Sequence, residues 1–379
     1  MPEAVLVSAL RTPIGTAGRG TLRDTTAFDL ADHIVRAAKE GLDPGQIDDV
    51  ILGEGLYGGG VIARHAAITA GLTTVPGLAM NRHCAAGLAA VQNAAASIRA
   101  GMDELIIAGG VNSASTSPRS RIRVGEEWMD WMSPTHPDRP DAPNRDMSIT
   151  VGWNASLKAR VTREDMDAWA LRSHRRAIRA IDEGRFKEEI VPIETPHGLF
   201  AVDEHPRRDT SMEKLARLKV LHPEIEGFSI TAGNACGAND GAAALVVASD
   251  RLGLPALAYV RSWASVGIDP VCTGLAPVEA IPKALKRAGL TLDQVDLFEI
   301  NEAFAAMCVA TIRLLELDPE AVNVSGSGCS LGHPVAATGA RMLVTLVHEL
   351  RRRGGGVGVA AMCAGGGMGS AAVIEVPAP

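Results

Sequence analysis

Cys84 has a residue type and a setting suited to nucleophilic chemistry. It follows a short apolar segment, residues 77–80, and the residues Asn81-Arg82-His83, and it precedes an Ala- and Gly-rich run with apolar positions at helical spacing. A thiol in the first turn of a helix lies at the positive end of the helix dipole, which favours the reactive thiolate. Cysteine is also a common buried residue. The stretch alone therefore leaves a nucleophile and an inert core residue both open.

Three further segments carry groups that could act on a nucleophile or its substrate. His333 lies in the Gly-rich segment SGSGCSLGHPVAATG, immediately before Pro334, a residue that suits the first position of a helix. Cys363 lies in AAMCAGGGMG, where successive glycines leave backbone N–H groups free to bind an anion. Asn301 follows the predicted strand LFEI, and its amide could fix a water or a carbonyl, or simply cap a helix. Taken together, the segments predict that His333 holds Cys84 as a thiolate and that Cys363 moves a second proton.

The composition favours a globular protein over a membrane or nucleic-acid-binding one. Of the 379 residues, 46% are hydrophobic and 21% are charged, and the net charge of -7 argues against a general nucleic-acid partner. No uninterrupted apolar run approaches the roughly 20 residues that a membrane span needs, and no basic n-region of a secretory signal is evident. The six cysteines lie at wide spacings without a CxxC pair, which predicts a reducing, cytoplasmic setting and no metal site.

Strand and helix patterns alternate through the first 110 residues, which predicts an α/β architecture with a mostly parallel sheet. We expect strands at residues 3–9, 48–53, 77–80 and 102–110, helices at 28–41, 64–71 and 85–101, a turn at Arg11-Thr12-Pro13 and a Gly-rich loop at 53–60.

The amino-acid composition changes between about residues 115 and 235, and we interpret this segment as an inserted loop domain. Prolines and charges are frequent there, and residues 162–184 form a predicted amphipathic helix that opens with a capping box, Thr-Arg-Glu-Asp. Trp128, Trp131 and Trp153 also lie in this segment, where they either shape a substrate pocket or pack the loop domain itself.

The second half of the chain repeats the pattern of the first. We expect strands at 241–249, 256–266, 297–300, 321–324 and 357–362 and helices at 278–289 and 334–352. Cys84 and His333 each lie on a turn before a helix, and the strand after each helix ends near a Gly-Gly pair. We therefore predict a duplicated unit with an N-terminal half at 1–255, interrupted by the loop domain, and a C-terminal half at 256–379. Both turns would open on one cleft beyond the strand ends.

The motifs NRHCAAG, NEAF, GHPVAATG and CAGGGMG, in this order and at these separations, resemble those of the thiolases, the family of acetyl-CoA acetyltransferases and 3-ketoacyl-CoA thiolases. The segments REDMDAWALRSHRRA, DEHPRRDTSMEKLARLK and TAGNACGANDGAA are similar to thiolase segments as well. The resemblance covers nearly the whole chain. It implies the duplicated thiolase fold, with stacked mixed sheets and helices between and around them. It also implies an enzyme of fatty-acid metabolism, such as β-oxidation, that forms a homodimer or a homotetramer.

The resemblance also implies a role for each reactive group. Cys84 would take the acyl group as a thioester after His333 removes its proton, and Cys363 would be the second acid and base. One oxyanion hole would be formed by His333 and a water held by Asn301, and the other by the backbone amides of Cys84 and Gly365. Two holes are needed because two different oxygens develop negative charge.

Coenzyme A and acyl-CoA are the implied substrates, and no permanently bound cofactor is implied. CoA would lie along the loop domain, with Lys219 and Arg217 as candidate cations for its phosphates and Cys236, Phe304 and Ala232 as further contacts.

Four positions depart from the usual thiolase pattern and leave the acyl group open. They are Ala86 behind the nucleophile, Asn112 after Gly-Gly, Asp146 in place of a histidine, and Cys236 in place of a serine. A ketoacyl-synthase-like condensing enzyme and a non-catalytic protein that binds CoA or lipid are the alternatives, but the first would pair its cysteine with two His or His and Asn rather than with a second cysteine.

Overall fold

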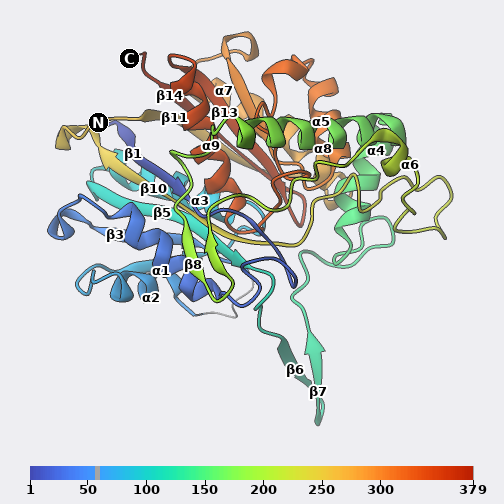
Figure 1. Ribbon diagram of the computed structural model, residues 1–379, viewed down its shortest axis with the longest axis horizontal. Coiled ribbons are helices and arrows are strands. Elements are labelled where there is room, and N and C mark those ends of the chain that lie inside the picture. Colours follow the sequence, from blue (N-terminus) through green and yellow to red (C-terminus); the bar gives the residue numbers. More distant parts are fainter. Residues whose placement is uncertain (56–59, 379) are drawn as a thin grey trace.

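The computed structural model describes residues 1–55 and 60–378 and has the predicted α/β architecture (Figure 1). Residues 56–59, half of the predicted Gly-rich loop at 53–60, lie outside the described residues. Within them, no helix is both long enough and apolar enough to cross a membrane.

The N-terminal half of the sheet has the strand order β4-β3-β5-β10-β1. These strands are β1 (Ala4–Arg11), β3 (Asp49–Gly53), β4 (Gly77–Met80), β5 (Leu105–Ser113) and β10 (Asn239–Ser249), with the short β2 (Gly15–Thr16) paired to β10. β3 runs parallel to β4 and β5, whereas β10 is antiparallel to β5 and to β1. The half is therefore mixed rather than mostly parallel, and Arg11 belongs to β1 rather than to a turn.

The C-terminal half repeats this topology in the order β12-β13-β14-β11. Its strands are β11 (Ala258–Gly267), β12 (Leu297–Ile300), β13 (Gly356–Ala364) and β14 (Met368–Val376). β12 and β13 are parallel, and β14 is antiparallel to both of its neighbours. The predicted strand at 321–324 is reduced to one parallel bridge from Val322 to Phe298, in the place that β4 takes beside β3. Two residue pairs between β1 and β11 join the halves.

Helices α3 (Ala86–Ala100) and α9 (Thr338–Arg352) lie between the two halves of the sheet and pack against each other (Figure 1). α1 (Ala27–Ala38) and α2 (Ile62–Thr69) cover the outer face of the N-terminal half, and α7 (Ala276–Ala288) covers that of the C-terminal half, with α8 (Ala305–Leu314) packed beside it against the helices of the loop domain. Small residues allow the central pair to approach closely, since a Cβ on Gly339 would lie 2.5 Å from the backbone nitrogen of Leu88. This contact fixes the starts of both helices relative to each other.

Helix α9 begins four residues later than predicted. Pro334 starts a hydrogen-bonded turn instead, with the N–H groups of Ala337 and Thr338 both donating to its carbonyl at 2.9 Å. His333 is consequently separated from the first helical residue, Thr338, by that turn.

The loop domain consists of short elements and one long helix. They are β6 (Ser120–Val124), β7 (Glu127–Trp131), the π-helical η2 (Ser148–Trp153), α4 (Asn154–Lys158), α5 (Arg163–Asp182), β8 (Ile193–Thr195), β9 (Gly198–Phe200) and α6 (Met212–Ala216). The predicted capping box is present: Thr162 and Asp165 bond each other's backbone N–H at the start of α5. Short 3-10 helices elsewhere are η1 (Pro44–Gln46), η3 (Asp250–Leu252), η4 (Pro270–Leu275), η5 (Leu292–Gln294) and η6 (Pro319–Ala321).

Strands β6 and β7 form a hairpin that projects from the body of the molecule (Figure 1). Trp128 is 58% exposed and Trp131 37% exposed, so internal packing is wrong for both residues. Trp131 lines a cavity together with Asn81 and Arg145, so its place in a substrate pocket stays a prediction. Trp153 does pack the loop domain, with its ring 5.2 Å from that of Phe228.

Candidate active site

Cys84 lies on a tight turn between β4 and α3. The side chain of Asn81 accepts a hydrogen bond from the N–H of His83 at 2.7 Å, and His83 has a positive φ of 46°. The N–H groups of Ala85 and Ala86 donate back to Arg82 and His83 at 3.0 Å. A left-handed residue that is not glycine is unfavourable by itself, so the turn depends on these local bonds to present the thiol.

The turns before α3 and α9 are brought together by glycine. A Cβ on Gly87 would lie 2.6 Å from the carbonyl oxygen of Ala336, and one on Gly110 would lie 2.1 Å from the same oxygen. Only glycine allows this approach. The packing places the Cys84 turn and the His333 turn on the same side of the molecule, as the duplicated pattern predicted.

His333 is buried, and its orientation is fixed from two sides. The side chain of Asn239 accepts its backbone N–H at 3.0 Å, and the ring nitrogen Nδ1 lies 2.6 Å from Oγ1 of Thr338. The Thr338 hydroxyl donates to the carbonyl of Pro334 at 2.9 Å, so it must accept from Nδ1–H. The proton therefore resides on Nδ1, and Nε2 keeps a lone pair with which to accept a proton.

Asn301 lies beside this imidazole at the end of β12. Its Nδ2 is 3.4 Å from Nε2 of His333, and its backbone N–H donates to Ala361 on β13 at 3.0 Å. Its Oδ1 is buried without a hydrogen-bond partner among the described residues. An unpaired buried amide oxygen is costly, which indicates that it serves a ligand or a water.

Cys363 and Gly365 approach the same place from the end of β13. The Sγ of Cys363 contacts Sδ of Met307 on α8 at 3.5 Å, and the backbone N–H of Gly365 bonds to Cys84. The loop domain closes over this turn, because a Cβ on Gly365 would lie 3.0 Å from Thr135 and 3.7 Å from Sδ of Met147. Four elements that are distant in sequence thus converge on one site.

The acid–base balance of the site differs from the sequence prediction. Burial raises the pKa of Cys84 to about 11, although the backbone N–H groups of Gly365 and of Cys84 itself lower it. Burial, with a smaller contribution from the charge of Arg341, lowers the pKa of His333 to about 3. Burial and the neighbouring Cys84 also raise the pKa of Cys363 well above its usual range. The expected resting thiolate is therefore wrong: at neutral pH the thiol and the imidazole are both uncharged.

Alkylation of Cys84 by iodoacetamide is expected to accelerate about tenfold per unit between roughly pH 7 and pH 10, because only the thiolate reacts. The pKa of Cys84, raised to about 11, keeps the thiolate fraction rising across this range. Peptide mass spectrometry at each pH measures the rate. Glutathione is the reference thiol and should level off above about pH 9. A plateau for Cys84 below about pH 8 would show a resting thiolate instead.

A cavity of about 650 Å³ leads away from the catalytic turns along the loop domain. Cys236 and Ala232 of the predicted CoA contacts line it, and the N–H of Cys236 donates to Ala303 at 2.9 Å. Phe304 is buried beside it and bridges to Ala235. Burial and the nearby Cys84 raise the pKa of Cys236 to about 12, so this thiol stays protonated.

The cations of this cavity are not the ones named from the sequence. Arg19, Arg207 and Lys214 line it, whereas Arg217 and Lys219 are exposed and are not among its lining residues. Helical position explains the difference. Leu215, the buried residue of α6, and Leu218 face the cavity, whereas Arg217 and Lys219, on either side of Leu218, are exposed and do not line it.

The atypical positions form their own contacts. Asp146 pairs with His222 at 2.8 Å, and the Nδ2 of Asn112 donates to the carbonyl of Asn239 at 3.0 Å. Ala86 is the first residue of α3. The sequence interpretation missed Thr338 and Asn239, which orient His333, although Thr338 lies within GHPVAATG, and its spacing of five residues from the histidine was a usable signal.

Among the described residues, no cluster of His, Cys, Asp and Glu side chains is arranged so that it could hold a metal ion.

Comparison with known proteins gives two family matches: "Thiolase, N-terminal domain" over residues 4–251 and "Thiolase, C-terminal domain" over residues 254–376.

Individual relatives match along the whole chain. An acetyl-CoA acetyltransferase of Pseudomonas aeruginosa is 43% identical over 98% of this chain and 98% of its own length. The crystal structure of the Bacillus anthracis acetyl-CoA acetyltransferase superposes with a TM-score of 0.92 at 41% identity, covering 99% of each chain. The crystal structure of human mitochondrial 3-ketoacyl-CoA thiolase in complex with CoA superposes with a TM-score of 0.91 at 36% identity, covering 99% of this chain and 98% of that chain.

Proposed function

The chain belongs to the thiolase family and is an acyltransferase, and from its site we propose that it cleaves 3-ketoacyl-CoA with CoA, or runs the reverse condensation, through an acyl thioester on Cys84. The observation that carries this proposal is the convergence of Cys84, His333, Asn301 and Cys363 on one site. A protein that only binds CoA or lipid would need neither the oriented imidazole nor the second thiol.

In the first step the neutral pair reacts. Nε2 of His333 takes the proton of Cys84 as the sulfur attacks the 3-keto carbon of the substrate. The carbon–carbon bond then breaks, and its electron pair leaves as the enolate of acetyl-CoA. Because burial disfavours both charged groups in the free enzyme, proton transfer coincides with attack rather than preceding it.

Cys363 completes each half of the reaction. Its thiol protonates the departing enolate carbon, and its thiolate then takes the proton of the incoming CoA thiol, whose sulfur attacks the Cys84 thioester. The acyl group leaves as acyl-CoA, and Cys84 recovers its proton from His333. The high pKa of Cys363 suits it to donate a proton to a carbanion, which is itself strongly basic.

Two sets of donors receive the two developing charges. The backbone N–H groups of Cys84 and Gly365 already bond to the Cys84 sulfur and are placed to hold the oxygen of a tetrahedral intermediate beside it. His333, with a water bound by the unpaired Oδ1 of Asn301, is placed to hold the thioester oxygen of the enolate. Removing one such donor typically costs about 10²–10³ in rate.

The cavity beside Cys236 is proposed to hold CoA. Leu215 and Leu218 offer apolar wall to its pantetheine arm or adenine, and the cations Arg19, Arg207 and Lys214 also line it and would take its phosphates, although Lys214 is paired with Asp209. The N–H of Arg207 donates to Nδ1 of His174 at 3.1 Å, which fixes the backbone that carries this cation. Arginine and lysine are the side chains that proteins use to bind phosphate.

CoA-dependent cleavage of a series of 3-ketoacyl-CoA thioesters of rising length tests the function and identifies the acyl group. In this assay Arg207→Met is expected to raise KM for CoA about tenfold, with kcat little changed, because it removes one charged contact that does not change during reaction. Arg217→Met is the matched control and should behave as the wild type. The absence of cleavage with every chain length would contradict the function, and equal effects of the two variants would contradict the placement of CoA.

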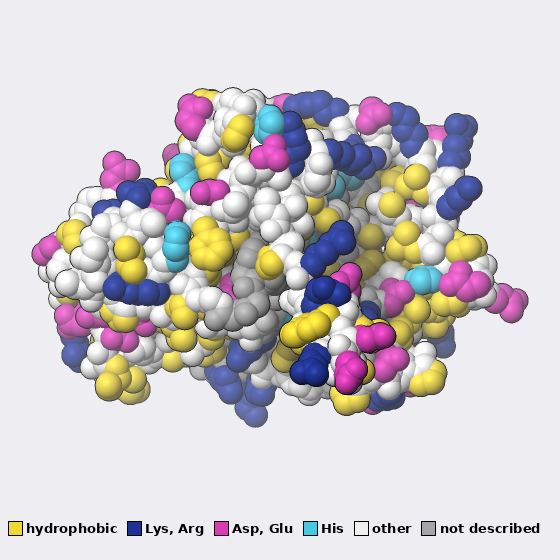
Figure 2. All heavy atoms as spheres, turned by 90° about the horizontal axis from the view of Figure 1, so that it is seen from below, with side chains coloured by type: hydrophobic (Ala, Val, Ile, Leu, Met, Phe, Trp, Pro, Cys, Tyr) yellow, Lys and Arg dark blue, Asp and Glu magenta, His cyan; other side chains and the backbone are white. Residues whose placement is uncertain are grey.

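We propose that the protein acts as a homo-oligomer in fatty-acid metabolism, in the cytoplasm, where its six unpaired cysteines would persist. The hairpin supports self-association, because Ile122 and Met129 pair across it with Trp131 on the same face, all exposed. Figure 2 views the molecule from the side on which the hairpin projects, with apolar side chains exposed among charged ones. Sedimentation of Met129→Glu against the wild type measures its contribution, and unchanged sedimentation would exclude one.

A further inference from the structure

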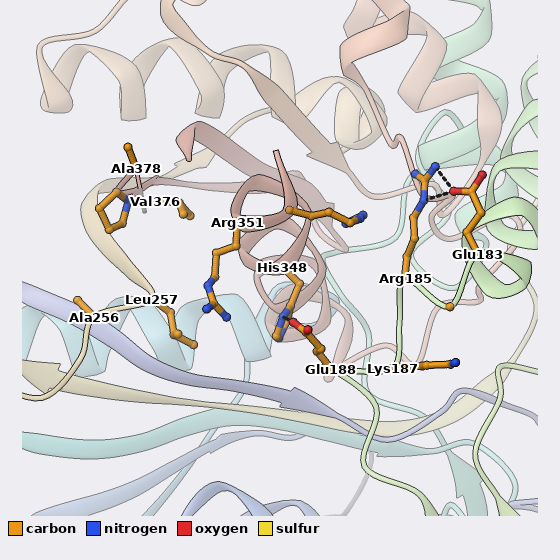
Figure 3. A pocket seen from close by; sticks show the side chains of 13 residues that line it. Glu183, Arg185, Lys187, Glu188, Ala256, Leu257, His348, Arg351, Val376 and Ala378 are labelled. Atoms are coloured by element: carbon orange, nitrogen blue, oxygen red, sulfur yellow. Dashed lines mark hydrogen bonds and ion pairs between the residues drawn. The ribbon is translucent and has the colours of Figure 1, made fainter. Parts of the chain in front are cut away.

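A second cavity, of about 640 Å³, lies at the far end of α9 and shares no lining residue with the CoA cavity. Figure 3 shows its walls: the loop after α5, the last turn of α9, the segment before β11 and the C-terminal residues after β14. Leu257, Val376 and Ala378 give it an apolar side. The catalytic mechanism uses none of these residues.

The cavity is also rich in cations. Arg185, Lys187, Arg351 and Arg352 line it. Arg185 is paired with Glu183, and Arg352 with Glu349.

Two of these cations lack a carboxylate. The side chains of Arg351 and Lys187 form no ion pair or hydrogen bond among the described residues, and in Figure 3 the Arg351 side chain extends between Leu257 and His348. The crowding of positive charge is reflected in the pKa of Arg352, which burial and the neighbouring Arg185 and Arg353 lower. An anion would relieve this repulsion.

His348 supplies a buried polar atom on the same wall. It is 9% exposed, and its Nε2 donates to the carbonyl of Ala9 at 2.9 Å. Its Nδ1 has no hydrogen-bond partner among the described residues. The nearest carboxylate oxygen, Oε2 of Glu188, is 3.8 Å away, beyond hydrogen-bond distance. Glu188 is 81% exposed, so it can swing aside for a ligand.

We propose that this cavity is a second ligand site, separate from the CoA cavity, that binds an organic phosphate through Arg351 and Lys187, while the unpaired Nδ1 of His348 accepts a hydrogen bond from a hydroxyl or amino group of the same ligand. A guanidinium offers two parallel N–H donors to a phosphate, and Lys187 adds a point charge. The apolar side formed by Leu257 and Val376 receives the body of the ligand. The volume falls in the range of small-molecule sites, which fits a nucleotide.

Isothermal titration with ADP tests the site in the Arg207→Met background, which weakens binding of the same nucleotide in the CoA cavity. We expect one ADP per chain, with affinity reduced at least about tenfold by Arg351→Met and by Lys187→Met, since each removes a charged contact. Arg175→Met is the matched control, because it removes an exposed arginine of α5 that forms no ion pair with a described residue, and it should leave the affinity unchanged. Arg351→Met in the otherwise wild-type chain should keep full thiolase turnover.

Two further probes identify the part of the ligand that is recognised. Adenosine is expected not to bind, and inorganic phosphate is expected to bind more weakly than ADP; phosphate binding as tightly as ADP would assign the site to the free ion. The proposal is overturned if ADP does not bind, if Arg351→Met and Lys187→Met leave the affinity unchanged, or if adenosine binds as tightly as ADP. Turnover measured alongside keeps this result separate from the proposed function, which depends on Cys84.

Discussion

Replacing Cys363 by alanine is expected to leave the acylation of Cys84 intact and to reduce overall turnover about 10²–10⁴-fold, the usual contribution of a positioned acid and base. The two cysteines lie on different elements: Cys84 precedes α3, and Cys363 lies on β13, where it contacts Met307. Cys363 combines a raised pKa, which suits a donor to the basic enolate carbon, with a position close enough to Cys84 for that residue to contribute to the rise. Intact-protein mass spectrometry measures acylation, and the cleavage assay measures turnover.

The neighbouring thiol provides the control for this variant. Cys236 is close enough to Cys84 and Cys363 for the three to influence one another's pKa, but its place is in the CoA cavity. Cys236→Ser should therefore retain turnover within about tenfold, because a hydroxyl keeps a donor of similar size at that wall. Full turnover by Cys363→Ala, or loss of turnover by Cys236→Ser alone, would show that the second proton carrier is assigned wrongly.

Replacing His333 by alanine is expected to slow acylation by at least about 10³, because it removes both a base and an oxyanion donor. Thr338→Val should cause a smaller loss, of about tenfold, because it removes only the acceptor that keeps the proton on Nδ1. Single-turnover acylation with acetyl-CoA measures both. The order of the two effects follows directly from the hydrogen-bond chain from Nδ1 to Thr338 to Pro334.

A second threonine separates this effect from a general loss of packing. The Thr311 hydroxyl is buried and donates to the carbonyl of Met307 at 2.8 Å, the same type of bond that Thr338 forms with Pro334. Thr311→Val should leave the acylation rate within a factor of about two. An unchanged rate in Thr338→Val would mean that the imidazole does not depend on this hydroxyl, and the assignment of Nε2 as the base would lose its support.

Features decided by neighbouring residues could be predicted from the sequence. The strands at 77–80 and 297–300 are observed with those bounds, and Thr162 caps α5 with Asp165 as its pattern indicated. The duplication was also visible, because each turn before a central helix is followed by a strand that ends at glycines. These patterns depend on side-chain periodicity and capping, which act within one or two turns of chain.

Features decided by tertiary contacts could not be predicted. The hairpin at Ser120–Trp131 was not predicted: its first strand alternates charged and apolar residues, but its second strand, EWMDW, does not, and both strands are exposed rather than packed on the core. The helical pattern of 334–352 gave no sign that the first four residues form a separate turn against Gly87 and Gly110. The predicted domain boundaries, including the limits of the loop domain, stay predictions.

The candidate site likewise has some features that could be predicted from the sequence and others that could not. The four reactive residues and their turns were visible in the sequence, but the charge state of Cys84 was predicted in the wrong direction, because a helix start favours thiolate only where water is near. Burial by β13, α9 and the loop domain reverses that preference. The cations that line the cavity proposed for CoA differ from Lys219 and Arg217 for a related reason, since only the fold shows which residues around α6 face the cavity.

The most direct test of the central claim, that Cys84 carries the acyl group, is mass spectrometry after incubation with acetyl-CoA at neutral pH. We expect a single acetyl group, mapped to the peptide containing Cys84, in the wild type and in Cys363→Ala, and none in Cys84→Ala. The group should leave when CoA is added. An unmodified Cys84 in the wild type, or an acetyl group on Cys236 instead, would contradict the account.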